Sequence, residues 1–445
     1  MDLRRGEHPV CHPEHASDGE VSARSELRAR TAAPAPLMRE GDSPSARAAA
    51  WRRPQNCRRR PGKAGLIIRL TTAISRSWPS TWRKSPPIQP LESFMRESID
   101  LPPGQIEIPA AWTGEEMAKH AENWLVELDK QDVAELELAA TGFLARSQDI
   151  GNLSKADFPL PRLAGHLTAL REKLIAGIGF EVLRGLPVET YSAQMSATIF
   201  CGIGAHLGGA RSQNAQGHIL GHVRDTGADA RDATTRIYQT AERQTFHTDS
   251  ADVVGLLCLK DAMQGGESLL VSTVTIYNEM RKRRPDLVRL LFDPIATDRR
   301  GEVPEGEKPY FEIPVLNWHA GLLTGIYQRQ YIDSAQRFPA AMRLSPAHVE
   351  ALDLFDSLAN DPKLNLSMRL RPGDMQFVYN HSLLHDRMGF RDWPDSDKRR
   401  HMLRLWLSIP GDRPLPECFR QRYGSIEVGD RGGIIVKGTR LNVPL

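Results

Sequence analysis

Residues 243–259, RQTFHTDSADVVGLLCL, place a histidine and a carboxylate two positions apart at the start of an apolar run. In an extended strand, residues i and i+2 point to the same side, so we expect His247 and Asp249 to direct an imidazole and a carboxylate at one point. These are two of the three ligands in the 2-His-1-carboxylate arrangement that holds non-haem Fe(II). A histidine beside an aspartate is also common as a hydrogen-bonded surface pair, so this stretch alone leaves both interpretations open.

A second stretch, residues 371–390, supplies histidines for the third position. Its sequence, RPGDMQFVYNHSLLHDRMGF, combines a turn over 371–374, an apolar strand-like run over 375–379, and then His381 and His385. Because the two histidines lie four residues apart, we expect only one of them to reach a metal shared with His247 and Asp249.

A third stretch, residues 399–410, is an apolar β-type run, RRHMLRLWLSIP, that contains Arg399, Arg400 and Arg404. An arginine inside such a run needs a buried or half-buried anion to offset its loss of hydration. The guanidinium fork matches a carboxylate through two hydrogen bonds. The run therefore predicts a carboxylated co-substrate.

The charge of the chain is distributed unevenly. Of its 58 Lys and Arg and 55 Asp and Glu, residues 1–90 hold 17 and 8, which leaves 41 and 47 for the rest. The remainder is thus mildly acidic, which argues against nucleic acid as a partner. The five cysteines are far apart with no C-x-x-C spacing, which argues against a zinc ribbon and a disulfide scaffold.

Residues 1–90 are rich in Arg, Pro, Ala and Ser and predict a disordered extension. An alternative is an over-extended start with the initiator at Met95. The eight acids in the first 42 residues count against an organellar transit peptide. No apolar run approaches the length that spans a bilayer, so we expect no membrane partner and a cytoplasmic location, with organellar import through the extension as the alternative.

Residues 91–445 predict one domain of mixed elements. Thr113 and Glu116 have capping-box spacing at the start of a predicted helix over 113–130, and further helices are predicted over 161–179, 192–208, 273–284 and 345–359. A short strand is predicted within 179–187. Later strands recur at short spacing, with Gly and Pro turns between most of them, over 254–260, 268–271, 311–316, 322–327, 375–379 and 402–408. This pattern is typical of a β-sandwich or barrel.

Five blocks of the chain together resemble a known family. They are GFEVLRGLP, FHTDSADVVGLLCL, GGESLLVS, RPGDMQFVYNHSLLHDR and RRHMLRLWLS. In this order they are similar to the taurine dioxygenase (TauD/TfdA) family of Fe(II)- and 2-oxoglutarate-dependent oxygenases, over roughly residues 101–445. The resemblance implies a mainly β fold with flanking helices and a double-stranded β-helix (jelly-roll) core.

The resemblance also implies the metal ligands, His247, Asp249 and His385, and favours His385 over His381. The cofactors implied are Fe(II), the co-substrate 2-oxoglutarate and O2. The reaction implied is hydroxylation or desaturation of a small organic molecule with release of succinate and CO2. Asp249 supplies a carboxylate where halogenating relatives have a small residue, so oxygenation is favoured over halogenation.

The co-substrate residues are implied in the same way. Arg404 matches the arginine that pairs with the distal carboxylate of 2-oxoglutarate, and Arg400 is the nearby second arginine. Ser268, in GGES, stands where many members have a threonine that bonds the same carboxylate. His401 alternates away from Arg400 on a strand and is interpreted as structural.

The substrate is less well defined by the sequence. Asn214 and Tyr238 lie in the polar stretch that lines the substrate pocket of relatives and are our substrate candidates, whereas Gln213 and Gln239 fit ordinary loop residues equally well. No clear match to the sulfonate-binding residues of taurine dioxygenase is found, which argues against taurine. Alternatives to the oxygenase are a mononuclear zinc hydrolase and a catalytically silent jelly-roll binding protein. The sequence leaves the oligomeric state open; a homo-oligomer is one alternative, since the family often forms dimers or tetramers.

Overall fold

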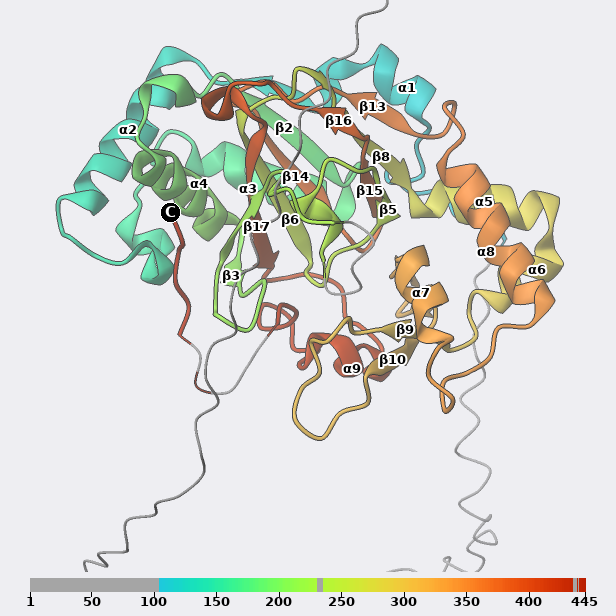
Figure 1. The fold of residues 1–445 in the computed structure, drawn as a ribbon. Coiled ribbons are helices and arrows are strands. Elements are labelled where there is room, and N and C mark those ends of the chain that lie inside the picture. The colour runs from blue at the N-terminus through green and yellow to red at the C-terminus, as the bar shows by residue number, and fades with distance from the viewer. Residues whose placement is uncertain (1–103, 230–234, 435–437, 439) are drawn as a thin grey trace, which may run out of the picture. The chain divides into compact units, whose positions relative to one another are not determined.

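Two β-sheets that face each other form the core of the computed structural model, which describes residues 104–229, 235–434, 438 and 440–445 (Figure 1). The larger sheet has the order β1 (Leu125–Glu127), β2 (Phe180–Arg184), β14 (Met375–Tyr379), β6 (Val253–Lys260), β17 (His401–Ser408) and β3 (Gly209–Arg211), with β4 (Leu220–Val223) also paired to β17. The smaller sheet has the order β13 (Leu366–Met368), β8 (Ser268–Ser272), β15 (Leu383–Arg387) and β5 (Gln244–His247). This arrangement confirms the predicted mainly β fold with a jelly-roll core.

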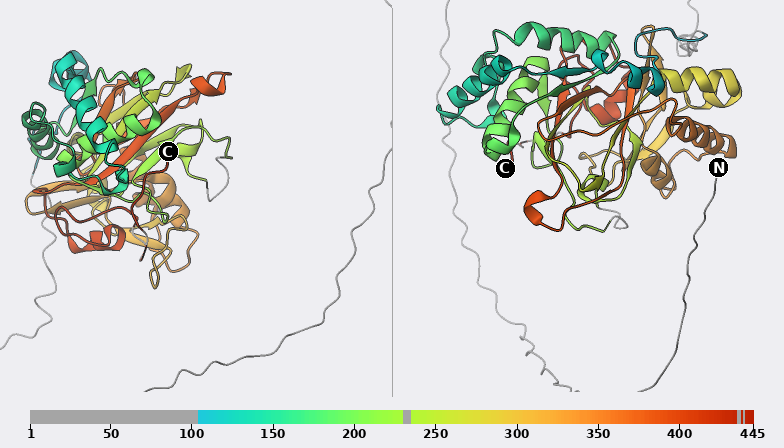
Figure 2. Two further views of the ribbon diagram at one scale, coloured as in Figure 1. Left: turned by 90° about the vertical axis from the view of Figure 1, so that its left-hand side faces the viewer. Right: turned by 90° about the horizontal axis from the view of Figure 1, so that it is seen from above.

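Helices cover the outer faces of both sheets (Figures 1 and 2). On the larger sheet lie α3 (Ala164–Ala176) and α4 (Ala193–Leu207), and α2 (Lys130–Leu144) packs against α4. Beside the smaller sheet lie α5 (Thr273–Arg283), α6 (Pro285–Leu290) and α8 (Pro346–Ala359), while α1 (Gly114–Lys119) contacts β13. A further group contains α7 (Arg329–Ala335), α9 (Arg420–Tyr423) and the hairpin of β9 (Ile295–Asp298) and β10 (Tyr310–Ile313). Two short strand pairs complete the described strands: β11 (Leu316–His319) with β12 (Leu322–Gly325), and β7 (Gln264–Gly265) with β16 (Phe390–Arg391).

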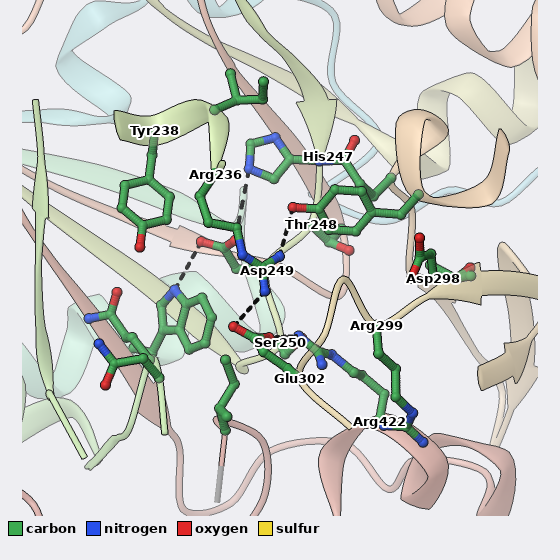
Figure 3. Close-up of a pocket in the computed structure, with 18 of the residues that line it drawn as sticks. Arg236, Tyr238, His247, Thr248, Asp249, Ser250, Asp298, Arg299, Glu302 and Arg422 are labelled. Carbon is green, nitrogen blue, oxygen red and sulfur yellow. Dashed lines mark hydrogen bonds and ion pairs between the residues drawn. The ribbon is translucent and has the colours of Figure 1, made fainter. Parts of the chain in front are cut away.

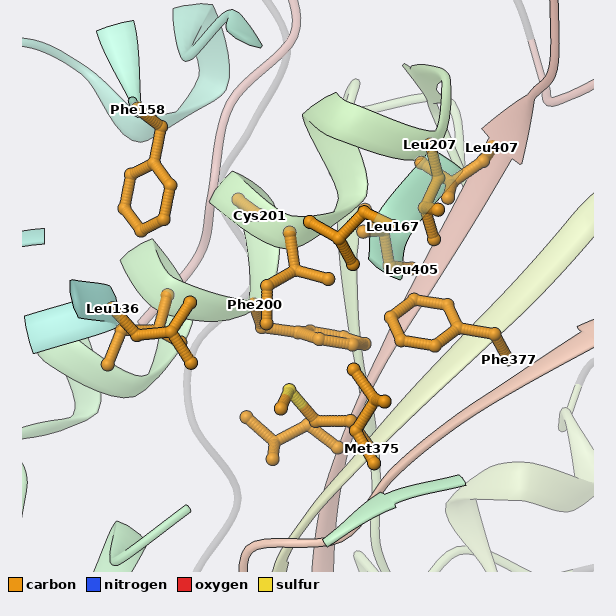
Figure 4. Close-up of a cluster of buried hydrophobic side chains, with 14 of the residues drawn as sticks. Leu136, Phe158, Leu167, Phe200, Cys201, Leu207, Met375, Phe377, Leu405 and Leu407 are labelled. Atoms are coloured by element: carbon orange, nitrogen blue, oxygen red, sulfur yellow. The ribbon is translucent and has the colours of Figure 1, made fainter. Parts of the chain in front are cut away.

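The alternation of side chains along β17 determines which residues reach the interior between the sheets. Leu403, Leu405 and Leu407 belong to the apolar cluster beneath α4, together with Phe377 and Phe200 (Figure 4). Each such fully buried side chain stabilises the fold by about 1.5–3 kcal/mol. Because neighbours on a strand point in opposite directions, the even-numbered residues of β17 face the smaller sheet, and Met402 accordingly packs in the cluster between the two sheets.

Two predicted elements were wrong in their extent. The capping box of Thr113 and Glu116 is present, but its helix ends at Lys119, and the segment that follows forms β1 before α2 begins. Pairing of Leu125 with Val182 outweighs the helical periodicity there, and the Asp129 side chain then caps α2 by accepting from the first turn. The predicted strand over 311–316 is divided into β10 and β11, with Pro314, which has no N–H to donate, between them.

The turn before β14 requires its glycine. Gly373 has φ of +89°, and a Cβ at this position would lie 2.0 Å from the carbonyl oxygen of Leu186. Both the left-handed backbone and the close approach exclude other residues. Next to it, the buried Asp374 carboxylate pairs with Arg184 of β2 at 2.7 Å and so fixes the start of β14. The predicted extension, residues 1–90, lies outside the described residues.

Candidate active site

His247, Asp249 and His385 converge between strands β5 and β15. His247 is the last residue of β5 and pairs directly with His385 of β15, with ring centroids 4.2 Å apart. Asp249 follows in the loop after β5, not in the strand as expected, yet Oδ1 lies 3.8 Å from Nε2 of His247 and Oδ2 lies 3.7 Å from Nε2 of His385. One ligand atom from each residue lies within 4.8 Å of the other two. Two imidazoles and one carboxylate at this spacing fit a 2-His-1-carboxylate metal site.

The protonation states of this triad suit metal ligation. Nδ1 of His247 lies 2.8 Å from the Thr245 carbonyl, to which it donates, so Nε2 is an acceptor and receives the Gln244 amide at 2.9 Å. Burial and the neighbouring His385 lower the pKa of His247 to about 3, which keeps its imidazole neutral near pH 7. Although burial opposes its ionisation, Arg404 and His385 hold the pKa of Asp249 well below its usual range.

The loop that carries Asp249 is fixed by backbone hydrogen bonds. The Asp249 N–H donates to Oδ1 of Asn380 at 3.2 Å, and Nδ2 of Asn380 donates to the carbonyl of Ala251 at 2.8 Å. On the other side, the Thr248 N–H donates to the Tyr327 carbonyl at 2.9 Å, and the Tyr327 N–H donates to the Thr248 hydroxyl at 3.0 Å. The carboxylate is therefore held in place before a metal binds.

Arg404 and Trp406, both on the interior face of β17, hold the Asp249 carboxylate. Nη1 of Arg404 lies 3.2 Å from Oδ2 of Asp249, and the Trp406 indole N–H donates to the same oxygen at 2.9 Å. Nε of Arg404 donates to Oε1 of Gln213 at 2.7 Å, while the Gln213 amide donates to the carbonyl of Arg404 and to that of Ile219. Gln213 is thus a positioning residue for Arg404.

A small cavity of about 40 Å³ beside the triad is lined by buried arginines. Arg400 is 3% exposed, and its Nη1 has no hydrogen-bond partner among the described residues. Arg387, two residues after His385, likewise has Nε and Nη1 without a partner in the described part of the chain. Burial, with the nearby Arg400, lowers the pKa of Arg387 to about 10. Ser268 lines the same cavity, and its hydroxyl lies 3.3 Å from Oε1 of Gln376 on the opposite sheet. Unpaired buried guanidiniums require an anionic ligand.

Residues 145–406 match the family described as "Taurine catabolism dioxygenase TauD, TfdA family". The FR-33289 synthase of Streptomyces rubellomurinus is 34% identical over 311 residues, which cover 68% of this chain and 91% of that protein. The chain belongs to the TauD/TfdA family. A uridine-5'-phosphate dioxygenase of Amycolatopsis sp is 27% identical over 187 residues, 39% of this chain and 64% of that protein.

The fold agrees with solved structures of iron oxygenases. Asparagine oxygenase in complex with Fe(II), 2S,3S-3-hydroxyasparagine and succinate has a TM-score of 0.50 and 18% identity, covering 64% of this chain and 93% of that one. The TauD/TfdA member described here is a 2-oxoglutarate-dependent non-haem iron dioxygenase that acts on a small molecule. As predicted, it uses Fe(II), 2-oxoglutarate and O2. The two alternative functions, a mononuclear zinc hydrolase and a catalytically silent binding protein, are therefore rejected.

The competing histidine, His381, lies in a different place in this TauD/TfdA dioxygenase. It is fully buried and its Nε2 lies 2.9 Å from Asp252. Arg431, also fully buried, pairs with Asp252 at 2.7 Å and with Asp412 at 2.8 Å. The guanidinium already supplies the cation between these two carboxylates, so the cluster is a structural ion network rather than a second metal site. His401 faces away from the triad, with its Nε2 2.8 Å from Nδ1 of His222.

The two substrate candidates of the dioxygenase occupy different environments. Tyr238 lines both the small cavity and a larger one of about 310 Å³ that is also lined by His247 and Asp249, and its ring centroid lies 4.8 Å from the Arg404 guanidinium. Asn214 also lines the larger cavity, but its Oδ1 accepts from the N–H groups of Gln216 and His218. Its side chain therefore stabilises the local turn.

Several functional contacts of the dioxygenase were not predicted. Trp406 could have been found, because it is two residues after Arg404 on the same strand face. Gln376 could have been found by the same alternation within 375–379. The arginines of the larger cavity, Arg236, Arg299 and Arg422, come from separate polar segments with no shared spacing, so only the folded chain brings them together.

Proposed function

We propose that His247, Asp249 and His385 hold Fe(II) in this dioxygenase and that Arg400 and Ser268 bind the distal carboxylate of 2-oxoglutarate. The observation that carries the proposal is the convergence of two imidazoles and one carboxylate within 4.8 Å, beside a cavity whose arginines have guanidinium nitrogens without a hydrogen-bond partner among the described residues. A zinc site built from the same ligands would leave those arginines without a role.

Arg400 is a better partner for the distal carboxylate than Arg404, to which the resemblance gave that role. The Arg404 guanidinium is engaged by Asp249 and Gln213. Arg400 makes no ion pair among the described residues: its guanidinium lies over the Phe390 ring at 5.1 Å, and its Nη2 contacts the sulfur of Met402 at 3.1 Å. Arg387 lines the same cavity and adds a second positive charge. Arg404 then keeps Asp249 ionised and oriented at the metal end of the co-substrate.

The chemistry follows from the cofactors. Bound Fe(II) and 2-oxoglutarate supply the activation of O2 that oxidises an otherwise unreactive C–H bond of the substrate, with succinate and CO2 as co-products. The chain provides ligation, orientation and a pocket from which water is largely excluded. Because Asp249 fills the position that a halide would need, hydroxylation or desaturation is the proposed outcome.

The substrate, the cellular location, the oligomeric state and the partners are more specific than this general function. The relatives' names point to different substrates, uridine 5'-phosphate and asparagine, so likeness selects no substrate for this chain. No helix of the described residues is long and apolar enough to cross a membrane. A cytoplasmic location, a homo-oligomeric state, and the absence of nucleic-acid and membrane partners remain predictions.

Metal binding tests the ligand set. The full chain, titrated with Fe(II) without oxygen, is expected to bind one ion, and His247→Ala or His385→Ala is expected to weaken binding about tenfold or more. His319→Ala, a substitution of an exposed histidine, is the matched control and should bind like the wild type. Equal Fe(II) affinity in all four proteins would exclude these ligands.

A further inference from the structure

Three arginines line the larger cavity in addition to Arg404, and neither the proposed metal site nor the 2-oxoglutarate site uses them. Arg236 comes from the segment before β5, Arg299 follows β9, and Arg422 lies in α9. Figure 3 shows them with Glu302 in the pocket that also holds His247 and Asp249. Their convergence from three distant parts of the chain needs a physical explanation, because like charges repel.

The acidic side chains of this cavity do not balance the three arginines. Of the acids that line it, Asp249 is held by Arg404. Asp298 faces Arg337 at 3.1 Å and accepts from the Ser334 hydroxyl. Only Glu302 remains, which leaves a local excess of about two positive charges.

Arg299 and Arg422 both lie beside the same aromatic ring. Their guanidinium carbons lie 5.7 and 5.8 Å from the centroid of the same ring, Phe311. Burial and then the charge of Arg422 lower the pKa of Arg299. Glu307 lies 3.5 Å from Arg299, but its side chain is 52% exposed and offers little compensation. Nε and Nη2 of Arg299 already donate to the carbonyls of Lys308 and Gln421, so Arg299 contributes positive charge to the cavity, and an anion bound at Arg422 would relieve the repulsion.

Glu302 marks a position that an oxyanion can occupy. Its Oε1 lies 2.5 Å from Nη2 of Arg236, and its Oε2 lies 3.5 Å from Nη2 of Arg422. Oε2 is buried and makes no hydrogen bond among the described residues, so this carboxylate satisfies the arginines incompletely. Arg236 also donates to the Tyr331 hydroxyl at 3.0 Å, which orients its fork toward the cavity.

The size of the cavity limits what can lie between the arginines and the triad. Its volume of about 310 Å³ is at the small end of ligand pockets. Nε of Arg422 donates at 2.7 Å to the hydroxyl of Ser250, the residue directly after Asp249. One small molecule can therefore contact the arginines and present a C–H bond to the triad.

We propose that the substrate carries a dianionic phosphoryl group, as a phosphonate or a phosphate monoester, which binds Arg236 and Arg422 near the charge of Arg299 and displaces the Glu302 carboxylate. Such a group has a charge of about −1.5 to −2 near pH 7 and three strong acceptor oxygens. It matches the charge excess and the forked donors of the cluster, whereas a carboxylate supplies half the charge. This inference rests on the proposed function and names the substrate class of the same site.

Calorimetric titration of the full chain with n-propylphosphonate and with n-propyl phosphate tests the proposal. The titrations are made without oxygen, with saturating 2-oxoglutarate so that the small cavity is filled, both with and without Fe(II). Both dianions are expected to bind, and preference for one identifies the source of the phosphoryl group. Butyrate and the neutral diethyl propylphosphonate are expected to bind at least about tenfold more weakly than the dianions, since charge-assisted hydrogen bonds are lost.

Variants of the cluster are expected to change phosphonate affinity in opposite directions, which a purely structural role of these residues would not produce. Arg236→Gln and Arg422→Gln are expected to weaken phosphonate binding about tenfold or more, because each removes charged donors. Glu302→Gln is expected to tighten it several-fold, because the competing carboxylate is gone. Arg420→Gln is the matched control: it is exposed, lies in the same helix and should change the affinity by less than about twofold.

Equal binding of the diester or of butyrate would overturn the proposal, and so would Glu302→Gln weakening the binding as the arginine variants do. Failure of the proposed function gives a different result, namely phosphonate binding without Fe(II)-dependent release of succinate.

Discussion

Arg400 and Arg404 are four residues apart in the chain, yet their surroundings assign them different tasks. Arg404 contacts a carboxylate of the protein itself, Asp249, at 3.2 Å. Arg400 is equally buried but has a guanidinium nitrogen without a partner in the described residues. Because an uncompensated buried charge is costly, Arg400 is the stronger candidate for an external carboxylate.

This difference predicts separate effects on co-substrate and metal. Arg400→Gln is expected to raise the KM for 2-oxoglutarate about 30-fold or more, because removing one partner of a buried charge pair costs about 2–5 kcal/mol. Its Fe(II) affinity should stay close to that of the wild type. Arg404→Gln is expected to weaken Fe(II) binding, because Asp249 loses a contact that orients it. Steady-state kinetics and metal titration measure the two effects.

The adjacent and exposed Arg399 provides the control, since Arg399→Gln removes the same charge outside the cavity. An unchanged KM in Arg400→Gln, together with a raised KM in Arg404→Gln, would return the distal-carboxylate role to Arg404.

At the residue scale, the sequence predicted the residues that short motifs carry. His247 and Asp249 came from one motif, and His385 was preferred to His381 by resemblance. Their roles stay predictions, but the geometry is compatible with them, because β15 pairs His385 with His247 while His381 turns into the Asp252 network. Arg236, Arg299 and Arg422 could not be predicted, since no local pattern links a loop, a strand end and a C-terminal helix.

At the scale of elements, β17 is the strand that connects the helical layer to the site. Its odd-numbered leucines pack beneath α4, and its even-numbered Arg404 and Trp406 hold Asp249. Its first residue, His401, meets His222 of β4 at 2.8 Å. The alternation that predicted this strand also separates its stabilising face from its functional face, whereas β1 could not be predicted because its formation depends on distant pairing with β2.

The contact between β17 and β4 should depend on pH. Burial, followed by the neighbouring His222, lowers the pKa of His401 from 6.5 to about 4. The unfolded chain therefore takes up this proton at higher pH than the folded chain, so its contribution to stability is present above about 6.5 and is lost as the pH falls toward about 4. His401→Gln keeps a hydrogen-bonding side chain that does not titrate. Its unfolding midpoint is expected to fall less than that of the wild type across this window.

Thermal unfolding of both proteins, followed by circular dichroism at a series of pH values, measures the difference. Since other groups also titrate, the comparison is between the two curves. Parallel curves would show that His401 does not carry this dependence.

At the scale of the whole molecule, two facing sheets bring separate parts of the chain to one cavity. The smaller sheet supplies His247, His385 and Ser268, and the larger sheet supplies Arg404. The order of strands that makes this possible was implied by the family resemblance, because no local signal gives the pairing of β5 with β15. The group of α9, β9 and β10 then adds Arg299 and Arg422 to the larger cavity, and Arg236 comes from the segment before β5.

The most direct test of the account is the release of succinate from 2-oxoglutarate by the purified full chain with Fe(II), ascorbate and O2. We expect the wild type to form succinate, to form more when its substrate is present, and to form none when Zn(II) replaces Fe(II). We expect His247→Ala to be inactive under the same conditions. Succinate release by His247→Ala at the rate of the wild type, or none by the iron-loaded wild type with any substrate, would contradict the proposed iron site.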